Sequence, residues 1–266
     1  KSLSSLDGAM GSAGDAFLVC HGSFNPVHRH HVEIMVQARA KLEEAGYRVL
    51  AGILAPTNRS YMVLWKGIAA VADEHRLAAL RLACSTAAGP EGWLRVDARG
   101  VDYGSGYKMI SRLLEPEFRR EHPEAIGFDI KGADVVVRYN AYRGQLWYPV
   151  VIVARSEATK SLMEGLEKAG LGTEGAGART FIIEAELPGD YSSTKLREAL
   201  RKGDEACVRL MCPDQAAEHL LAHRRALFLD EQREEDSSEI ADTSAAPKRL
   251  RLDGTPGPRP AAKRAL

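Results

Sequence analysis

Histidines recur in the segment HGSFNPVHRHH, residues 21–31, which follows a short apolar run. His28 and His31 stand three residues apart where a helix is expected to begin, so their imidazoles share one face of that helix. A helix N-terminus offers N–H groups without intrahelical acceptors and a partial positive charge, and both suit an anion. Imidazole N–H groups can add hydrogen bonds to phosphate oxygens. The segment therefore predicts a phosphate site.

Two other interpretations of this segment stay open at this point. The first is a plain strand-to-helix turn whose histidines face solvent, and it is favoured for His30, which points away from the other two. The second is a zinc site, but no Cys, Asp or Glu nearby completes a ligand set.

A second polar segment, GDYSSTKLREALRKG, occupies residues 189–203. Ser192 or Ser193 is a suitable helix N-cap, and Lys195 and Arg197 fall in the first turn of the predicted helix. Cations are unfavourable at a helix N-terminus, where acids are preferred, unless a polyanion binds there. The hydroxyls, the backbone N–H groups and a guanidinium fork could then form a phosphate cradle. The alternative is a capped surface helix with ordinary basic residues.

Short apolar runs alternate along the chain with amphipathic helical patterns. Strands are expected at 16–21, 48–55, 94–97, within 128–134, at 150–154 and at 179–184. Helices are expected between 28 and 46, at 73–86, around 110–118, and at 156–169, 193–202 and 213–226. This alternation predicts an α/β fold with a doubly wound, Rossmann-like parallel sheet in a single domain. In such sheets ligands bind beyond the carboxyl ends of the strands, where both polar segments fall.

Together, GSFNPxxxxH after the first strand and SSTKxR opening a late helix resemble the signature pair of nicotinamide/nicotinate mononucleotide adenylyltransferases. The eukaryotic branch is the closer match, because it carries Ser-Phe-Asn at this place. The likeness extends over most of 16–228. It includes Lys66-Gly67, His75-Arg76, Gly132-Ala133-Asp134, Leu146-Trp147 and Arg155.

The resemblance implies a nucleotidyltransferase that moves AMP from ATP to nicotinamide or nicotinate mononucleotide, giving NAD or deamido-NAD and pyrophosphate. A phosphate monoester is largely dianionic at pH 7, so its attacking oxygen needs no general base. The protein then has to position the substrates and neutralise charge. Two alternatives stay open: another nucleotidyltransferase of this fold, such as one acting on phosphopantetheine, and a non-catalytic nucleotide-binding relative.

The resemblance also assigns roles to individual residues. Catalytic contacts with the phosphates fall to His31, His28, Arg197 and Lys66. The ATP and phosphate contacts fall to Ser23, Phe24, Ser193, Thr194, Lys195, Leu196 and Arg197. Ribose and nucleotide contacts fall to Gly132, Asp134 and Arg155, and the nicotinamide pocket to Leu146 and Trp147, the latter by stacking. Magnesium is expected with ATP, held mainly by phosphate oxygens and water.

The chain departs from the family pattern near two strands. YMVLWK at 61–66 is longer and more apolar than the family's loop, and its Trp65 is interpreted as a packing residue. A second stacking tryptophan of the family is missing after Val96, where Tyr103 could substitute for it.

Composition excludes several classes of protein. Lys plus Arg and Asp plus Glu are both 36, which argues against a chain that coats nucleic acid or an anionic membrane. No apolar run approaches the roughly 20 residues of a membrane helix. The four cysteines form no CxxC pair, which favours a reducing compartment over a disulfide framework. The sequence leaves open the acid or amide preference and the subunit number, a homo-oligomer included.

Charge is concentrated toward the end of the chain. Residues 230–242 are strongly acidic, and residues 247–266 are basic and rich in proline. Such a composition predicts a disordered tail over 230–266, after a nucleotidyltransferase domain over 15–229 and a disordered N-terminus or expression remnant over 1–14. Within the tail, PKRLR and PAAKR resemble two nuclear-import clusters, which predicts an import receptor as a partner and a nuclear location. A solvated tail on a cytoplasmic protein is the alternative.

Overall fold

The structure is a computed structural model that describes residues 13–87, 89, 92–138, 148–154, 160–165, 180–187 and 189–228. The predicted acidic and basic tail lies outside these residues. Of the predicted N-terminal segment 1–14, only residues 13 and 14 are described. The first strand begins at Gly14.

Six parallel strands form one sheet in the order β3-β2-β1-β4-β5-β6. They are β1 (Gly14–Gly22), β2 (Tyr47–Pro56), β3 (Leu94–Val96), β4 (Ile126–Gly132), β5 (Val150–Ala154) and β6 (Thr180–Glu184). The chain runs outward from β1 to β3 and then returns to the other side of β1 with β4. This order confirms the predicted doubly wound α/β fold and places its topological switch point between β1 and β4.

Helical segments connect these strands and follow the last one. The α-helices described over their full length are α1 (Arg29–Glu44), α2 (Asp73–Ala87), α3 (Gly106–Met109), α4 (Glu115–Phe118), α5 (Ala133–Arg138), α7 (Ser193–Lys202), α8 (Glu205–Met211) and α9 (Asp214–Ala222). The other helical turns are η1 (Tyr61–Trp65), η2 (Ala98–Asp102), η3 (Ile110–Leu114) and η5 (Arg224–Ala226). The predicted helix over 110–118 is therefore divided between η3 and α4, and the one over 213–226 ends at Ala222 before the turn η5.

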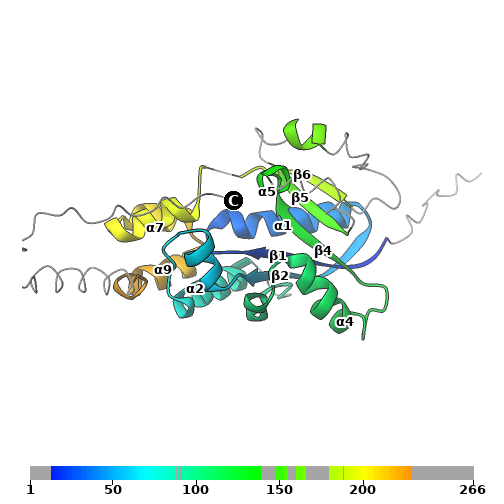
Figure 1. Ribbon diagram of the computed structural model, residues 1–266, viewed down its shortest axis with the longest axis horizontal. Coiled ribbons are helices and arrows are strands. Elements are labelled where there is room, and N and C mark those ends of the chain that lie inside the picture. The colour runs from blue at the N-terminus through cyan, green and yellow to red at the C-terminus, as the bar shows by residue number, and fades with distance from the viewer. Residues whose placement is uncertain are drawn as a thin grey trace, which may run out of the picture. The chain divides into compact units, whose positions relative to one another are not determined.

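The side chains of β1 alternate between two apolar layers. Leu18 and Cys20 belong to the core under α1, α2, α7 and α9, while Phe17 and Val19 belong to the core under α3 and η3. Figure 1 shows α1 and the α4 segment on opposite sides of the β1 and β2 strands. Because both faces of β1 are covered, its residues form a continuous apolar run rather than an alternating pattern.

Two observations bear on the class of protein. None of the helices in the described ranges is both long and apolar enough to span a bilayer. All four cysteines lie in those ranges as free thiols, and burial raises the pKa of Cys20, Cys84 and Cys212 to about 12.

Candidate active site

The carboxyl ends of β1 and β4 meet at the switch point of the sheet. Val19 pairs with Asp129, and each strand ends three residues later, β1 at Gly22 and β4 at Gly132. The loop that follows β1 and the turn that follows β4 therefore begin at the same level of the same edge. This is the position where open α/β sheets bind their ligands.

Buried hydrogen bonds hold the loop after β1 in one conformation. The side chain of Asn25 is 1% exposed; it donates to the carbonyl of Ala69 and accepts from the amide of Val71, both at 2.8 Å. Arg76 of α2 is fully buried and donates to the carbonyl of Ser23 at 2.8 Å. Because these bonds join the loop to distant segments of the chain, the loop is preorganised by tertiary contacts.

The N-terminus of α7 lies against this same loop. Ser193 Oγ donates to the carbonyl of Pro26 at 2.8 Å. Arg197 Nη1 donates to the carbonyl of Asn25 at 2.7 Å, across 172 residues of sequence, and Arg197 Nη2 lies 3.3 Å from Thr194 Oγ1. The two polar segments therefore form one site, with the first turns of α1 and α7 beside the same loop.

Ser192 begins α7, since its side chain accepts from the amide of Lys195 at 3.2 Å. The Lys195 ammonium pairs with Asp190. Leu196 is fully buried in the apolar core, and its amide donates to the carbonyl of Ser192 at 3.0 Å. Leu196 therefore anchors the helix by packing.

His28 and His31 lie together, as their spacing predicts. Their ring centroids are 3.8 Å apart, and the edge of Phe24 meets His31 at a centroid distance of 5.0 Å. His28 is the N-cap of α1, and its backbone N–H donates to His31 Nδ1 at 3.1 Å. Since Nδ1 accepts this bond, a neutral His31 carries its proton on Nε2. His31 thus presents a hydrogen-bond donor at the start of α1.

The expectation that His30 faces solvent is wrong. His30 is only 2% exposed, and its ring stacks on that of Tyr191 at a centroid distance of 4.8 Å. Tyr191 directly precedes the N-cap of α7. His30 therefore helps to hold the beginning of α7 against α1, a contact that the helix periodicity of α1 alone did not reveal.

Lys66 reaches the site from the end of η1. Its ammonium donates to Ser23 Oγ at 2.8 Å and lies 5.3 Å from the centre of the Tyr61 ring.

The packing role expected for Trp65 is wrong, because this residue is 82% exposed. Within η1 only Met62 is buried, so this turn packs a single side chain onto the domain.

Gly132 and Asp134 follow β4 directly. Asp134 is exposed in the first turn of α5, and a Cβ on Gly132 would lie 2.5 Å from Asp134 Oδ1. Glycine is therefore needed for this approach of the carboxylate to the backbone. Leu146, Trp147 and Arg155 lie outside the described residues. Tyr103 packs partly buried against the core under α3.

Sequence reasoning missed a buried polar group beneath the switch point. Asp129 is 1% exposed on β4, and the Lys131 ammonium lies 3.1 Å from its Oδ2. Burial raises the pKa of Asp129 and lowers the pKa of His21 at the end of β1. A Cβ on Gly106 would lie 2.2 Å from Asp129 Oδ1, so α3 closes over the carboxylate. The sequence did carry a signal for this buried group, because Asp129 and Lys131 are two charged residues placed two positions apart in an otherwise apolar strand.

Comparisons with known proteins agree with this architecture. A protein-family model described as cytidylyltransferase-like matches residues 19–199. The chain is 23% identical to the nicotinamide/nicotinic acid mononucleotide adenylyltransferase of Arabidopsis thaliana, over 78% of this chain and 88% of that protein. It is 38% identical to the rice protein of the same name over 76 residues, which are 29% of each chain. It is also 35% identical over 81 residues to nicotinamide/nicotinic acid mononucleotide adenylyltransferase 2 of Rattus norvegicus, 30% of this chain and 24% of that one. The chain thus aligns with less than a third of the rice and rat proteins.

Two solved structures share the fold. Both are Plasmodium falciparum nicotinic acid mononucleotide adenylyltransferase, one complexed with NaAD and the other with APC. The first has a TM-score of 0.53 at 10% identity and covers 79% of this chain and 96% of its own. The second has a TM-score of 0.51 at 12% identity and covers 78% and 95%. At these identities the likeness extends to the fold alone.

Proposed function

The chain belongs to the cytidylyltransferase-like family, and we propose that it transfers AMP from ATP to nicotinamide or nicotinate mononucleotide. The products are NAD or deamido-NAD and pyrophosphate. The relatives named above support this assignment of substrates. The observation that carries it is the hydrogen bond from Arg197 to the carbonyl of Asn25 at 2.7 Å, which joins the two phosphate-binding segments into one site.

The mononucleotide's phosphate attacks the α-phosphorus of ATP, and pyrophosphate leaves. The attacking oxygen is largely unprotonated at pH 7, because the second pKa of a phosphate monoester is about 6. The site therefore does not need a general base; it needs positive charge and hydrogen-bond donors around the reacting phosphates.

The described residues supply these groups from three directions. His31 offers its Nε2–H from the start of α1, and Lys66 brings its ammonium to Ser23. Arg197 adds a nearly buried guanidinium, 7% exposed, at the start of α7. Burial strengthens the field of such a charge, because less water screens it. The N-terminal N–H groups of both helices add to the same positive region.

Magnesium enters in this proposal as part of the substrate, the magnesium complex of ATP. The cradle is built from imidazole, ammonium, guanidinium and hydroxyl groups rather than from a set of carboxylates. Such groups hold phosphate oxygens, whereas magnesium prefers oxygen ligands in an octahedron that includes several waters. The ion is therefore held mainly by phosphate oxygens and water, where it neutralises part of the phosphate charge.

Other contacts follow from the resemblance. Asp134 is proposed to accept hydrogen bonds from ribose hydroxyls, beside the close backbone at Gly132. Trp147 and Leu146 are proposed to line the nicotinamide pocket and Arg155 to lie near the nucleotide.

The basic clusters at 247–251 and 260–264 are proposed to bind an import receptor and direct the protein to the nucleus. A fluorescent fusion of the full chain that stays nuclear after both clusters are replaced by alanine would refute this last point.

A pyrophosphate-release assay tests the activity. The full chain is incubated with ATP and magnesium, and with nicotinamide mononucleotide, nicotinate mononucleotide or phosphopantetheine in separate reactions. Release with either mononucleotide, together with the dinucleotide in the product mixture, is the expected result. Release only with phosphopantetheine, or with none of the three, contradicts the proposal. Sedimentation of the same preparation gives the subunit number.

A further inference from the structure

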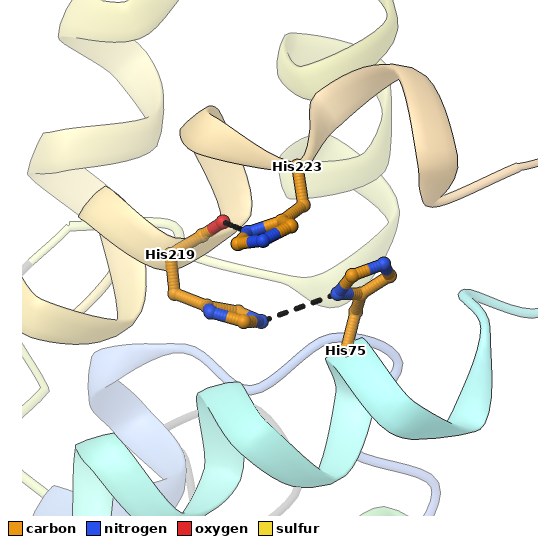
Figure 2. Close-up of side chains that lie close together, drawn as sticks. All are labelled: His75, His219 and His223. Carbon is orange, nitrogen blue, oxygen red and sulfur yellow. Dashed lines mark hydrogen bonds between the residues drawn. The ribbon is translucent and has the colours of Figure 1, made fainter.

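Three histidines outside the proposed active site converge between α2 and α9. His75 lies in the first turn of α2, His219 lies in α9, and His223 is the C-cap of α9. His219 and His223 share one face because they are four residues apart. Figure 2 shows the three imidazoles facing one another, with ring centroids 5.4 Å, 4.7 Å and 4.4 Å apart. The packing of α2 against α9 therefore joins a residue from one helix to an i, i+4 pair from the other.

The nitrogen atoms of this cluster have spacings close to those of a metal site. One ring nitrogen from each histidine lies within 4.8 Å of the others. His75 Nδ1 and His219 Nε2 are 3.3 Å apart. Two nitrogens bound to a tetrahedral zinc at about 2.05 Å stand about 3.3 Å from each other. One edge of the tetrahedron thus has its expected length. The other two distances, which lie within 4.8 Å, would shorten if the exposed His223 ring moved toward the pair.

The contacts around the cluster favour the tautomers of His75 and His223 that leave a lone pair for a metal ion. His223 Nδ1 lies 2.9 Å from the carbonyl of His219, which can only accept, so the proton is on Nδ1 and the lone pair on Nε2. His75 directs its Nε2 toward Glu74, whose Oε1 is 3.6 Å away. A carboxylate behind a ligating imidazole is a common second partner in metal sites, because it orients the ring and raises its basicity.

A hydrogen bond between two neutral imidazoles explains the contact of His75 with His219. It does not explain why a third imidazole stands beside both, where protonation of any ring repels the other two. Three unprotonated imidazoles around one point are instead a typical zinc ligand set with one open position. We propose that His75, His219 and His223 bind one zinc ion, with water as the fourth ligand.

Such an ion would link α2 to α9. The residue after His75 is Arg76, which holds the carbonyl of Ser23 in the active-site loop. The ion would therefore stabilise the helix pair that supports this loop, without contacting the substrates. This role is structural, and it does not depend on which nucleotide the protein uses.

Zinc binding to the metal-stripped full chain tests the proposal directly. Calorimetric titration is expected to give one ion per chain, and cobalt substitution is expected to give the visible absorption of four-coordinate Co²⁺. Because zinc would bind the folded state, it should also raise the melting temperature. His223→Gln is the main variant, since His223 is exposed and its replacement leaves the core intact. It should weaken zinc binding by about 100-fold or more and abolish the thermal shift, because one of three ligands is lost.

His219→Ala serves as the second variant and His122→Gln as the matched control. His122 lies outside the cluster, where it contacts Asp15, and its replacement should leave zinc affinity unchanged. The histidines of the active site are retained in all three variants. Failure of the wild-type chain to bind zinc would overturn the proposal. Unchanged affinity in His223→Gln and His219→Ala would place the ion at other residues and would overturn it equally.

Discussion

His31 has two separable tasks, and replacing it tests both. Its Nδ1 accepts the backbone N–H of His28 at 3.1 Å and so caps α1, while its Nε2–H is directed to the phosphates in the proposed reaction. His31→Ala removes both groups. His31→Gln and His31→Glu keep an oxygen acceptor at the third position of the helix, where these residues form the capping box. Neither of them keeps the imidazole donor.

The magnitudes follow from these contacts. Loss of one donor to developing charge lowers kcat by about 10²–10³-fold, or about 2.7–4 kcal/mol. Loss of the cap lowers the free energy of unfolding by about 1 kcal/mol, which for a domain of this size is a melting-temperature decrease of about 2–4 °C. His31→Ala should show both effects. His31→Gln keeps an amide donor and should lose less activity than His31→Ala, at a stability near that of the wild type. His31→Glu should lose more activity than His31→Ala because its carboxylate repels phosphate, while its stability stays near that of the wild type.

Steady-state pyrophosphate release and thermal unfolding of the same preparations give the two quantities. An interaction made only in the transition state lowers kcat and kcat/KM together, so KM for the mononucleotide should change little in His31→Ala. A His31→Glu variant that retains wild-type kcat would refute the catalytic task. Equal stability of His31→Ala and the wild type would refute the capping task.

Three further predictions concern residues around the same fold. Lys66→Ala should lower kcat/KM for ATP by about 10–100-fold, the value of one hydrogen bond to a charged group, with little change in melting temperature because Lys66 is exposed. Arg76→Met should lower the free energy of unfolding, measured with urea, by roughly 3 kcal/mol, because two hydrogen bonds from a buried charge to the carbonyls of Ser23 and Thr57 are lost. A decrease below about 1 kcal/mol would mean that the loop does not depend on this guanidinium. Asp15→Asn should destabilise the protein more at pH 7 than near pH 3. The hydrogen bond from Arg48 lowers the pKa of Asp15, so the carboxylate's contribution is present above its unfolded pKa and is lost as the pH falls through the folded value. An equal effect of Asp15→Asn at both pH values would contradict this.

Much of the fold follows from local signals. The predicted helix at 193–202 matches α7 closely, because Ser192 caps its beginning and Gly203 ends it with a left-handed φ of 73°. Alternating apolar runs and helices gave the doubly wound parallel sheet. Hence the two segments proposed to bind phosphate could be placed at one edge of the sheet before their contacts were known.

Packing decided what local signals could not. Helix periodicity did not show that His30 is covered by Tyr191, since the covering residue lies about 160 positions away in the sequence. It also could not show that Trp65 stays exposed, because a large aromatic residue in an apolar segment usually packs. Both errors, for His30 and for Trp65, concern whether a distant segment covers the side chain.

The amino-acid sequence alone determined the chemistry of the proposed phosphate site, because capping residues, turn residues and the spacing of His28 and His31 act within a few residues of one another. Only the tertiary structure joined Arg197 to Asn25, closed α3 over Asp129 and brought His75 to His219. Contacts between separate elements depend on which faces of the helices are buried together, and this is fixed by the packing of the whole core.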